Sequence, residues 1–154
     1  AHAFTESVAQ DFNHRFKDTV LKVNKVANRR GGESPPSVSH QNGLDIDVAY
    51  PSKNGLHNYR SIVSKGGRLT RSGEVVERTW ELIKLMDSKG VVAQFISDRV
   101  IINALRSHAK SKREARKFKS TLDKLIHWKG HRDHLHVRLM CTHLNPDCRE
   151  LDEK

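Results

Sequence analysis

The stretch HLHVRL, His134–Leu139, alternates polar and apolar side chains with a period of two. Successive side chains of a β-strand point to opposite faces, so the two histidines and the arginine would share one face and the three aliphatic residues the other. The aliphatic face suits a buried core. The histidine face suits either a metal site built on a sheet or a solvated surface, and this stretch alone leaves both open.

A second alternating stretch, GLDIDVAY (43–50), predicts another half-buried strand with Asp45 and Asp47 on its polar face. His40 precedes this strand at the end of a loop. His40, Asp47 and one histidine of the first stretch would make a set of two histidines and one carboxylate. Catalytic zinc sites keep three protein ligands and leave a fourth position for water. The alternative is a plain strand with solvated acids.

The remaining patterns predict four helices and two further strands. The helices are expected at Thr5–Phe16, Glu74–Ser88, Asp98–Lys119 and Thr121–Trp128, and the further strands at Thr19–Ala27 and Val91–Ile96. Ser72 is expected to cap the second helix. The segments 28–39 and 51–73 are read as loops. Because helices and strands do not alternate regularly, we predict an α+β fold in one domain, residues 1–154, with a small central antiparallel sheet flanked by helices.

The chain is strongly basic, with a formal net charge of +10. Seven lysines and arginines stand against one acid, Glu114, in the segment Arg106–Lys119. This segment favours an anionic partner such as nucleic acid, phospholipid head groups or bacterial wall polymers, although a merely solvated surface would look the same. No apolar run approaches the ~18 residues that a membrane span requires.

Two cysteines, Cys141 and Cys148, lie close together near the C-terminal end. One pair is too few for a disulfide scaffold or for a zinc site made of cysteines alone. A local disulfide formed in an oxidising compartment fits better than two free thiols of a cytosolic protein.

The motifs SHQNGLDID (39–47) and HRDHLHVRLMC (131–141) together resemble the penicillin-insensitive murein endopeptidases. That family falls in a group with lysostaphin, D-alanyl-D-alanine peptidases and the hedgehog signalling domain. The group pattern is H-x6-D, matched here from His40 to Asp47, followed by H-x-H, matched by His134 and His136. The family also shows a histidine three residues before H-x-H, here His131, and HVRL-x-C running on to a second cysteine.

The resemblance implies a role for each matched residue. His40, Asp47 and His136 would bind Zn²⁺. His134 would orient or deprotonate the attacking water and stabilise the transition state, and His131 would line the site and contact the substrate or its developing charge. The implied reaction is hydrolysis of amide bonds in the peptide cross-links of peptidoglycan, of the D-Ala–diaminopimelate type, by zinc-activated water. The resemblance further implies a periplasmic or secreted location and favours a Cys141–Cys148 disulfide.

Neighbouring residues have two readings each. Asp45 could hydrogen-bond a ligand histidine or be a solvated acid. Arg138 could bind a substrate carboxylate or a neighbouring acid. Trp128 could flank the cleft or end a helix in the core. Asp133 is expected to point away from His134 if the strand begins there.

The basic segment would then meet anionic cell-wall polymers or lipopolysaccharide. Two other functions stay open. A metal-dependent nuclease or nucleic-acid binder could use the basic helix against phosphates, although no nucleic-acid-binding module is recognised and aromatic residues are few, at 6%. A non-catalytic, hedgehog-like zinc domain is the third reading. No HExxH helix is present, so a thermolysin-type glutamate base is not indicated.

Overall fold

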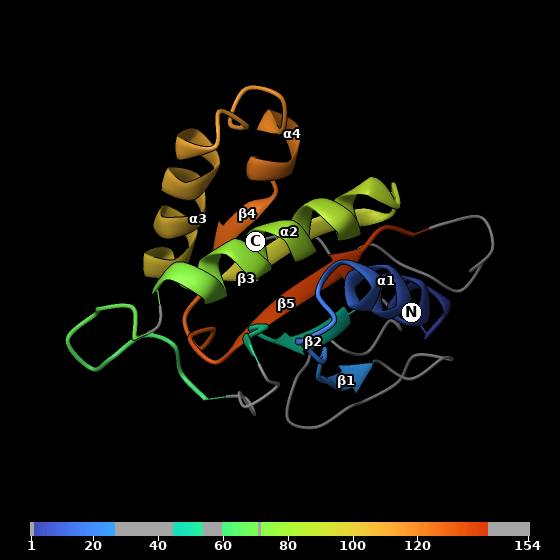
Figure 1. Ribbon diagram of the computed structural model, residues 1–154, viewed down its shortest axis with the longest axis horizontal. Helices are drawn as coiled ribbons and strands as arrows, with labels where there is room; N and C mark the ends of the chain where they lie inside the picture. The colour runs from blue at the N-terminus through green and yellow to red at the C-terminus, as the bar shows by residue number, and fades with distance from the viewer. Residues whose placement is uncertain (1, 27–44, 54–59, 71, 142–154) are drawn as a thin grey trace.

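The two alternating stretches are neighbouring strands of one sheet in the computed structural model of the chain (Figure 1). The structure describes residues 2–26, 45–53, 60–70 and 72–141. Within them the sheet has five strands in the order β1-β2-β5-β3-β4. Their bounds are β1 Val23–Val26, β2 Asp45–Ala49, β3 Val92–Ser97, β4 Leu125–His127 and β5 His134–Leu139.

The sheet is mostly antiparallel, and the predicted α+β class is confirmed. β5 lies at its centre and pairs antiparallel with β2 on one side and β3 on the other, while β1 extends the sheet antiparallel beyond β2. The one parallel pair is β3 with β4, so the sheet is mixed rather than wholly antiparallel.

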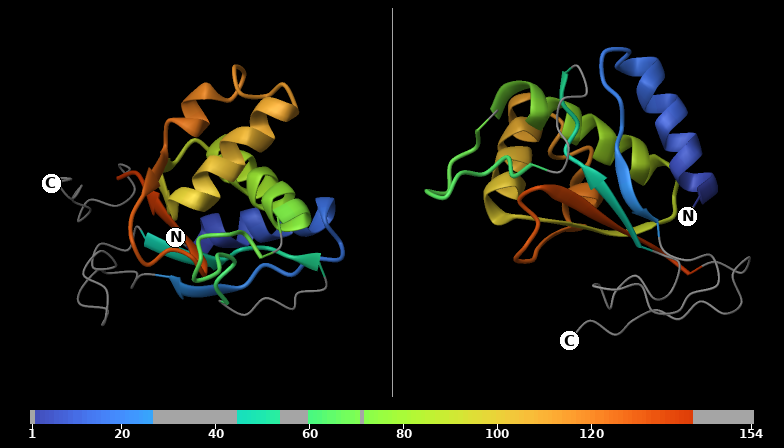
Figure 2. Two further views of the ribbon diagram at one scale, coloured as in Figure 1. Left: turned by 90° about the vertical axis from the view of Figure 1, so that its left-hand side faces the viewer. Right: turned by 90° about the horizontal axis from the view of Figure 1, so that it is seen from below.

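Three helices cover one face of this sheet: α1 (His2–Arg15), α2 (Ser72–Ser88) and α3 (Arg99–Ser111) (Figures 1 and 2). The aliphatic residues of the two alternating stretches are buried in one core with these helices. Val8 and Phe12 bring the predicted stripe of α1 to that core, and Trp80 and Ile83 do the same for α2. The period-two pattern therefore buries one face of β2 and β5 and leaves the other for the acids and histidines.

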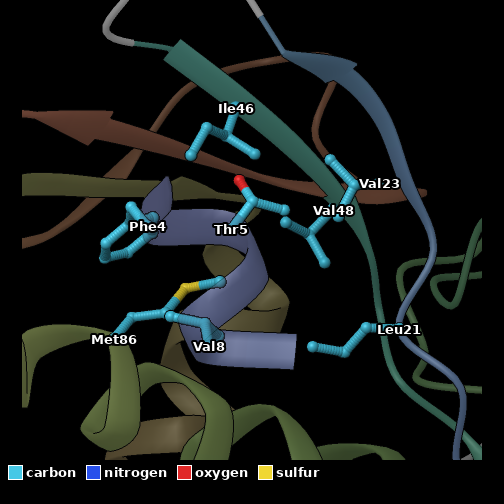
Figure 3. A pocket seen from close by; sticks show the side chains of 8 residues that line it. All are labelled: Phe4, Thr5, Val8, Leu21, Val23, Ile46, Val48 and Met86. Carbon is cyan, nitrogen blue, oxygen red and sulfur yellow. The ribbon is translucent and has the colours of Figure 1, made fainter. Parts of the chain in front are cut away.

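The core under β1 and β2 encloses a small apolar pocket (Figure 3). α1 contributes Phe4, Thr5 and Val8, and the strands contribute aliphatic side chains from above. The remaining lining residues are Leu21, Val23, Ile46, Val48 and Met86. This pocket lies on the opposite side of β2 from its two aspartates, because alternate side chains of a strand point to opposite faces.

The prediction of a helix over Thr121–Trp128 is wrong for most of its length. A short helix, α4 (Lys119–Leu122), is followed after two residues by strand β4. The amide of Phe95 bonds to the carbonyl of Lys124 at 2.9 Å, which starts a parallel ladder along β3. A short apolar run can form either a helix or a strand, and here pairing with the open edge of β3 favours the strand.

The predicted helix Asp98–Lys119 begins as expected but ends early. Asp98 caps α3 by accepting a hydrogen bond from the amide of Val100, and the helix stops at Ser111. Arg113 then adopts a left-handed backbone conformation, with φ of 59°. The turn brings the Glu114 carboxylate to Lys84 at 2.8 Å and to the indole of Trp80 at 3.3 Å, so tertiary contacts with α2 end the helix.

Smaller differences concern element ends. β1 begins four residues later than the predicted strand Thr19–Ala27, and α2 begins at Ser72 itself rather than after it. None of the helices in the described part of the chain is long and apolar enough to cross a membrane.

Candidate metal and catalytic site

The register of β2 against β5 sets two aspartates opposite the motif of histidines and arginine. Asp47 faces His136, Asp45 faces Arg138, and Ala49 faces His134 across the antiparallel ladder. Directly opposite side chains of such a pair approach closely enough to interact. The polar faces of two stretches nearly 90 residues apart in sequence are thereby joined into one site.

His136 lies at the centre of this site and is buried, with 4% of its surface exposed. Its Nε2 is 2.7 Å from Asp45 Oδ1, and its Nδ1 is 3.0 Å from Asp47 Oδ1. Burial alone lowers the pKa of His136, but the hydrogen bonds and charges of Asp45 and Asp47 outweigh it and raise the pKa to about 9. Both ring nitrogens are therefore oriented by carboxylates.

Asp45 is fully buried and is not a solvated acid. Besides His136, its carboxylate accepts a hydrogen bond from Arg138 Nε at 3.1 Å, and Arg138 Nη2 lies 3.5 Å from the other oxygen. Arg138 thus binds a neighbouring acid rather than presenting its guanidinium to solvent. A buried carboxylate needs such partners because an unpaired buried charge is costly.

His134 stands next to this pair at the start of β5. Its Nε2 is 3.8 Å from Asp47 Oδ1, and its Nδ1 is 2.6 Å from Asp133 Oδ1. The expectation that Asp133 points away from His134 is wrong. The residue precedes β5 in the bend that leads into the strand, where alternation does not apply, so its carboxylate folds back onto the imidazole. Because a carboxylate accepts, Nδ1 donates this hydrogen bond, and Nε2 lies on the side of Asp47.

His131 completes a group of three imidazoles. Its ring centroid is 4.9 Å from that of His134 and 5.8 Å from that of His136. Its Nδ1 donates to the carbonyl of Trp128 at 2.9 Å, and burial lowers its pKa. His131 is therefore a neutral imidazole at pH 7 with Nε2 as its free acceptor.

Trp128 is exposed beside this group. It keeps 61% of its surface accessible, so the interpretation of Trp128 as a core residue at a helix end is wrong. An exposed tryptophan offers an apolar ring and an N–H donor, with which it can contact a ligand.

Two residues that shape the site carry no recognisable sequence signal of that role. Tyr50 directly follows β2 and Ser97 ends β3, and both hydrogen-bond the turn that carries His131, Tyr50 through its hydroxyl and Ser97 through its backbone carbonyl. The one available clue is that Tyr50 continues the buried face of its strand, where a tyrosine hydroxyl needs a partner.

The predicted ligand set is described only in part. His40 lies outside the described residues, and among the residues that are described no group of three or more His, Cys, Asp or Glu side chains is placed to hold a metal. Asp47 Oδ1 and His136 Nδ1, at 3.0 Å, nevertheless fit a shared ion, since two donors bound to one zinc at about 2 Å lie about 3 Å apart. The Asp45–His136 hydrogen bond is the contact that commonly orients a metal-binding histidine.

Comparisons with known proteins agree with the motifs. The family model for penicillin-insensitive murein endopeptidases matches residues 1–154. A curated penicillin-insensitive murein endopeptidase of Yersinia enterocolitica (serotype O:8 / biotype 1B) is 27% identical over 158 residues, which is 92% of this chain and 55% of that protein. The chain therefore spans about half the length of the curated relative it matches.

Proposed function

The chain belongs to the penicillin-insensitive murein endopeptidase family, and from that premise we propose that it is a zinc-dependent peptidoglycan hydrolase. Its substrate would be the amide bonds of peptide cross-links, of the D-Ala–diaminopimelate type. The observation that carries the proposal is the Asp45–His136–Asp47 arrangement, in which Asp45 and His136 are buried, with His134 and His131 around it. A merely structural strand pair would not gather three imidazoles over two carboxylates.

Asp47 and His136 would hold the metal together with His40, whose ligand role is a proposal from the sequence motif. A zinc ion bound there would lower the pKa of a bound water to near neutrality and polarise the scissile carbonyl. Asp45 keeps the His136 ring oriented through Nε2, so Nδ1 stays directed at Asp47.

His134 would transfer protons. Asp133 holds its Nδ1, and its Nε2 faces the side where Asp47 lies. From that position Nε2 would take a proton from the attacking water and deliver it to the leaving amine. His131, held neutral by burial, would contact the substrate near the developing charge, and exposed Trp128 would pack against the peptide stem.

The location and the disulfide follow from the same proposal. A hydrolase of peptidoglycan would act outside the cytoplasm, in the periplasm or after secretion, where disulfides persist. Cys141 directly follows the last paired stretch of β5 and packs against the core, and Cys148 lies outside the described residues. The Cys141–Cys148 disulfide stays a prediction.

The basic segment would bind the polyanionic surface on which such an enzyme works. Five of its cations form what we call the cationic surface, because they are exposed and have no ion pair with a described carboxylate: Arg106, Lys110, Arg113, Arg116 and Lys117. The other two are paired, Lys112 with Glu81 and Glu114, and Lys119 with Asp123. We propose that the cationic surface binds anionic wall polymers or lipopolysaccharide in a salt-dependent way.

Substitution of the five cations by glutamine tests this surface. The variant should bind purified wall material more weakly in a sedimentation assay, and its binding should depend less on salt. Hydrolysis of a small soluble muropeptide should be unchanged. Unchanged binding to the wall would contradict the proposal. Lys119→Gln is the control, because that charge is exposed and already paired with Asp123 within the molecule.

A nuclease is less well supported by the arrangement. The connection between α3 and α4, which carries most of the cationic surface, lies at the top of Figure 1, whereas β5 begins with His134 at the lower left. A nuclease that used these cations to hold phosphates at the metal would need them beside it.

Digestion of purified peptidoglycan with and without a chelator tests the proposed function. We expect soluble muropeptides whose masses identify a cut cross-link, their loss on chelation, and recovery on adding back zinc. Lysis that is insensitive to chelation would overturn the zinc mechanism. Nicking of plasmid DNA with a divalent metal, without muropeptide release, would favour the nuclease.

A further inference from the structure

The turn from Trp128 to His131 is hydrogen-bonded to the rest of the molecule at both of its ends. At one end the amide of Trp128 donates to the carbonyl of Ser97 at 3.1 Å. At the other, the hydroxyl of Tyr50 donates to the carbonyl of His131 at 2.7 Å. Tyr50 and Ser97 also bond to one another through their hydroxyls, at 2.5 Å. One buried pair of side chains therefore joins β2, β3 and the turn.

The donor and the acceptor of each hydrogen bond between Ser97, Tyr50 and His131 can be assigned. The carbonyl of His131 only accepts, so the single proton of the Tyr50 hydroxyl goes to it. Ser97 must then donate its own proton to the Tyr50 oxygen. Burial raises the pKa of Tyr50 well above its ordinary value, so the hydroxyl stays protonated and keeps donating. The order is Ser97 to Tyr50 to the backbone of His131.

The turn needs such a fastening. Gly130 has φ of +92°, a backbone conformation that side chains of L-residues rarely adopt, and a Cβ added there would meet nothing within 4 Å. Glycine is thus required by the conformation and not by crowding, and it brings the greatest backbone freedom of any residue. The imidazole of His131 is itself tied back to Trp128, the other end of the same turn. The position of the turn therefore determines the position of the His131 imidazole.

We propose that Tyr50 is a positioning residue, supported by Ser97, that sets the His131 imidazole at its place beside His134 and His136. Tyr50 itself is 1% exposed and cannot touch a substrate, so its effect passes through the backbone of His131. The proposal rests on the proposed hydrolase function only in that His131 contributes to turnover there. A 1 Å displacement of a group that contacts the reacting centre lowers turnover strongly.

The test is Tyr50→Phe, which removes the hydroxyl and keeps the ring in the core. We expect the kcat for muropeptide hydrolysis to fall about three- to tenfold, the range of one lost hydrogen bond, with KM and zinc content unchanged. In the background of His131→Ala, the same substitution should have no further effect on kcat, because its path to the site is gone. Ser97→Ala should act in the same direction and should also lose its effect in that background.

Two further measurements separate positioning from general destabilisation. Thr121→Val removes another buried hydroxyl, which donates to Asp87 on α2 and not to Tyr50 or His131, and should leave kcat unchanged while lowering the unfolding temperature. In the metal-free protein, the imidazole ¹⁵N signals of His131 should broaden or shift in Tyr50→Phe and not in Thr121→Val.

The outcomes are distinct. Wild-type kcat in Tyr50→Phe, or an equal loss of kcat with and without His131, would overturn the positioning role. Unchanged His131 signals would overturn it as well. A wild-type protein that releases no muropeptides would instead refute the proposed function, and the ¹⁵N signals would still decide whether Tyr50 holds His131.

Discussion

Asp47 and His136 are direct partners across the β2–β5 ladder, with Asp47 Oδ1 3.0 Å from His136 Nδ1. Backbone hydrogen bonds of two paired strands hold this distance, and Asp45 holds the far side of the same imidazole. A pair of donors built on strands is more rigid than one built on loops. If Asp47 and His136 bind the metal as proposed, we infer that both side chains are in place before a metal arrives.

Replacing Asp47 by asparagine should therefore abolish tight zinc binding without unfolding the sheet. The substitution keeps the size of the side chain and removes its charge. We expect the zinc affinity to fall by at least about 100-fold, since loss of a partner that only orients a ligand already costs 10–100-fold. Titration against a competing chelator measures this. Asp123→Asn, an exposed acid paired with Lys119, is the control and should bind like wild type. Equal affinities would exclude Asp47 as a ligand.

His134 should separate catalysis from metal binding. Its Nε2 is 3.8 Å from Asp47, too far for a direct hydrogen bond, and its Nδ1 is held by Asp133. His134→Ala should retain zinc with near wild-type affinity and lower the kcat of muropeptide hydrolysis by about 10²–10⁴, the usual contribution of a proton-transferring group. Metal content and turnover measured on the same preparation decide the matter. Loss of zinc would make His134 a ligand, and intact lysis would leave it without a catalytic role.

Much of this site could be predicted from the two alternating stretches, because a period of two assigns each side chain to a face. The pairing of β2 with β5 could not be predicted in this way. The alignment of Asp47 with His136 depends on backbone hydrogen bonds between segments far apart in sequence, and a slip of one residue would turn every side chain to the other face. The contact of Asp133 with His134 depends on the bend before β5. The strand at Leu125–His127 exists because the edge of β3 was open to it.

Asp45 should contribute to stability as well as to metal binding, since it is fully buried between His136 and Arg138. Asp45→Asn would leave the guanidinium of Arg138 without its charged partner. We expect the unfolding free energy of the metal-free protein to fall by about 3 kcal/mol and the zinc affinity by about 10–100-fold. Denaturant unfolding and zinc titration measure the two effects.

A second substitution, Arg138→Met, tests whether the unpaired guanidinium causes the loss of unfolding free energy in Asp45→Asn. In the Asp45→Asn background it should restore part of the stability, because the unpaired cation is gone, and should leave the zinc affinity low. Stability unaffected by Asp45→Asn would show that the buried carboxylate contributes nothing net.

The acid stability of the fold should depend on Glu81, which lies on α2 and is 4% exposed. Burial raises the pKa of Glu81, but hydrogen bonds from Lys84 and Lys112 and the charge of Arg15 outweigh it, so the pKa lies below the ordinary 4.5. A carboxylate with a lowered pKa in the folded state stabilises the protein above the unfolded pKa. That contribution is lost as the pH falls through the folded pKa.

Glu81→Gln should therefore lower the unfolding free energy by about 1.5–3 kcal/mol at pH 7, the contribution of hydrogen bonds to a charged group. The difference from wild type should persist down to about pH 4.5 and shrink below it, because wild-type Glu81 then becomes protonated and neutral like glutamine. Urea unfolding in the presence of a chelator measures this without the pH dependence of metal binding. Glu77→Gln, on the exposed side of the same helix, should change little at any pH. Parallel curves for Glu81→Gln and wild type from pH 7 to pH 3 would show that the ion pairs around Glu81 do not set the acid limit of this fold.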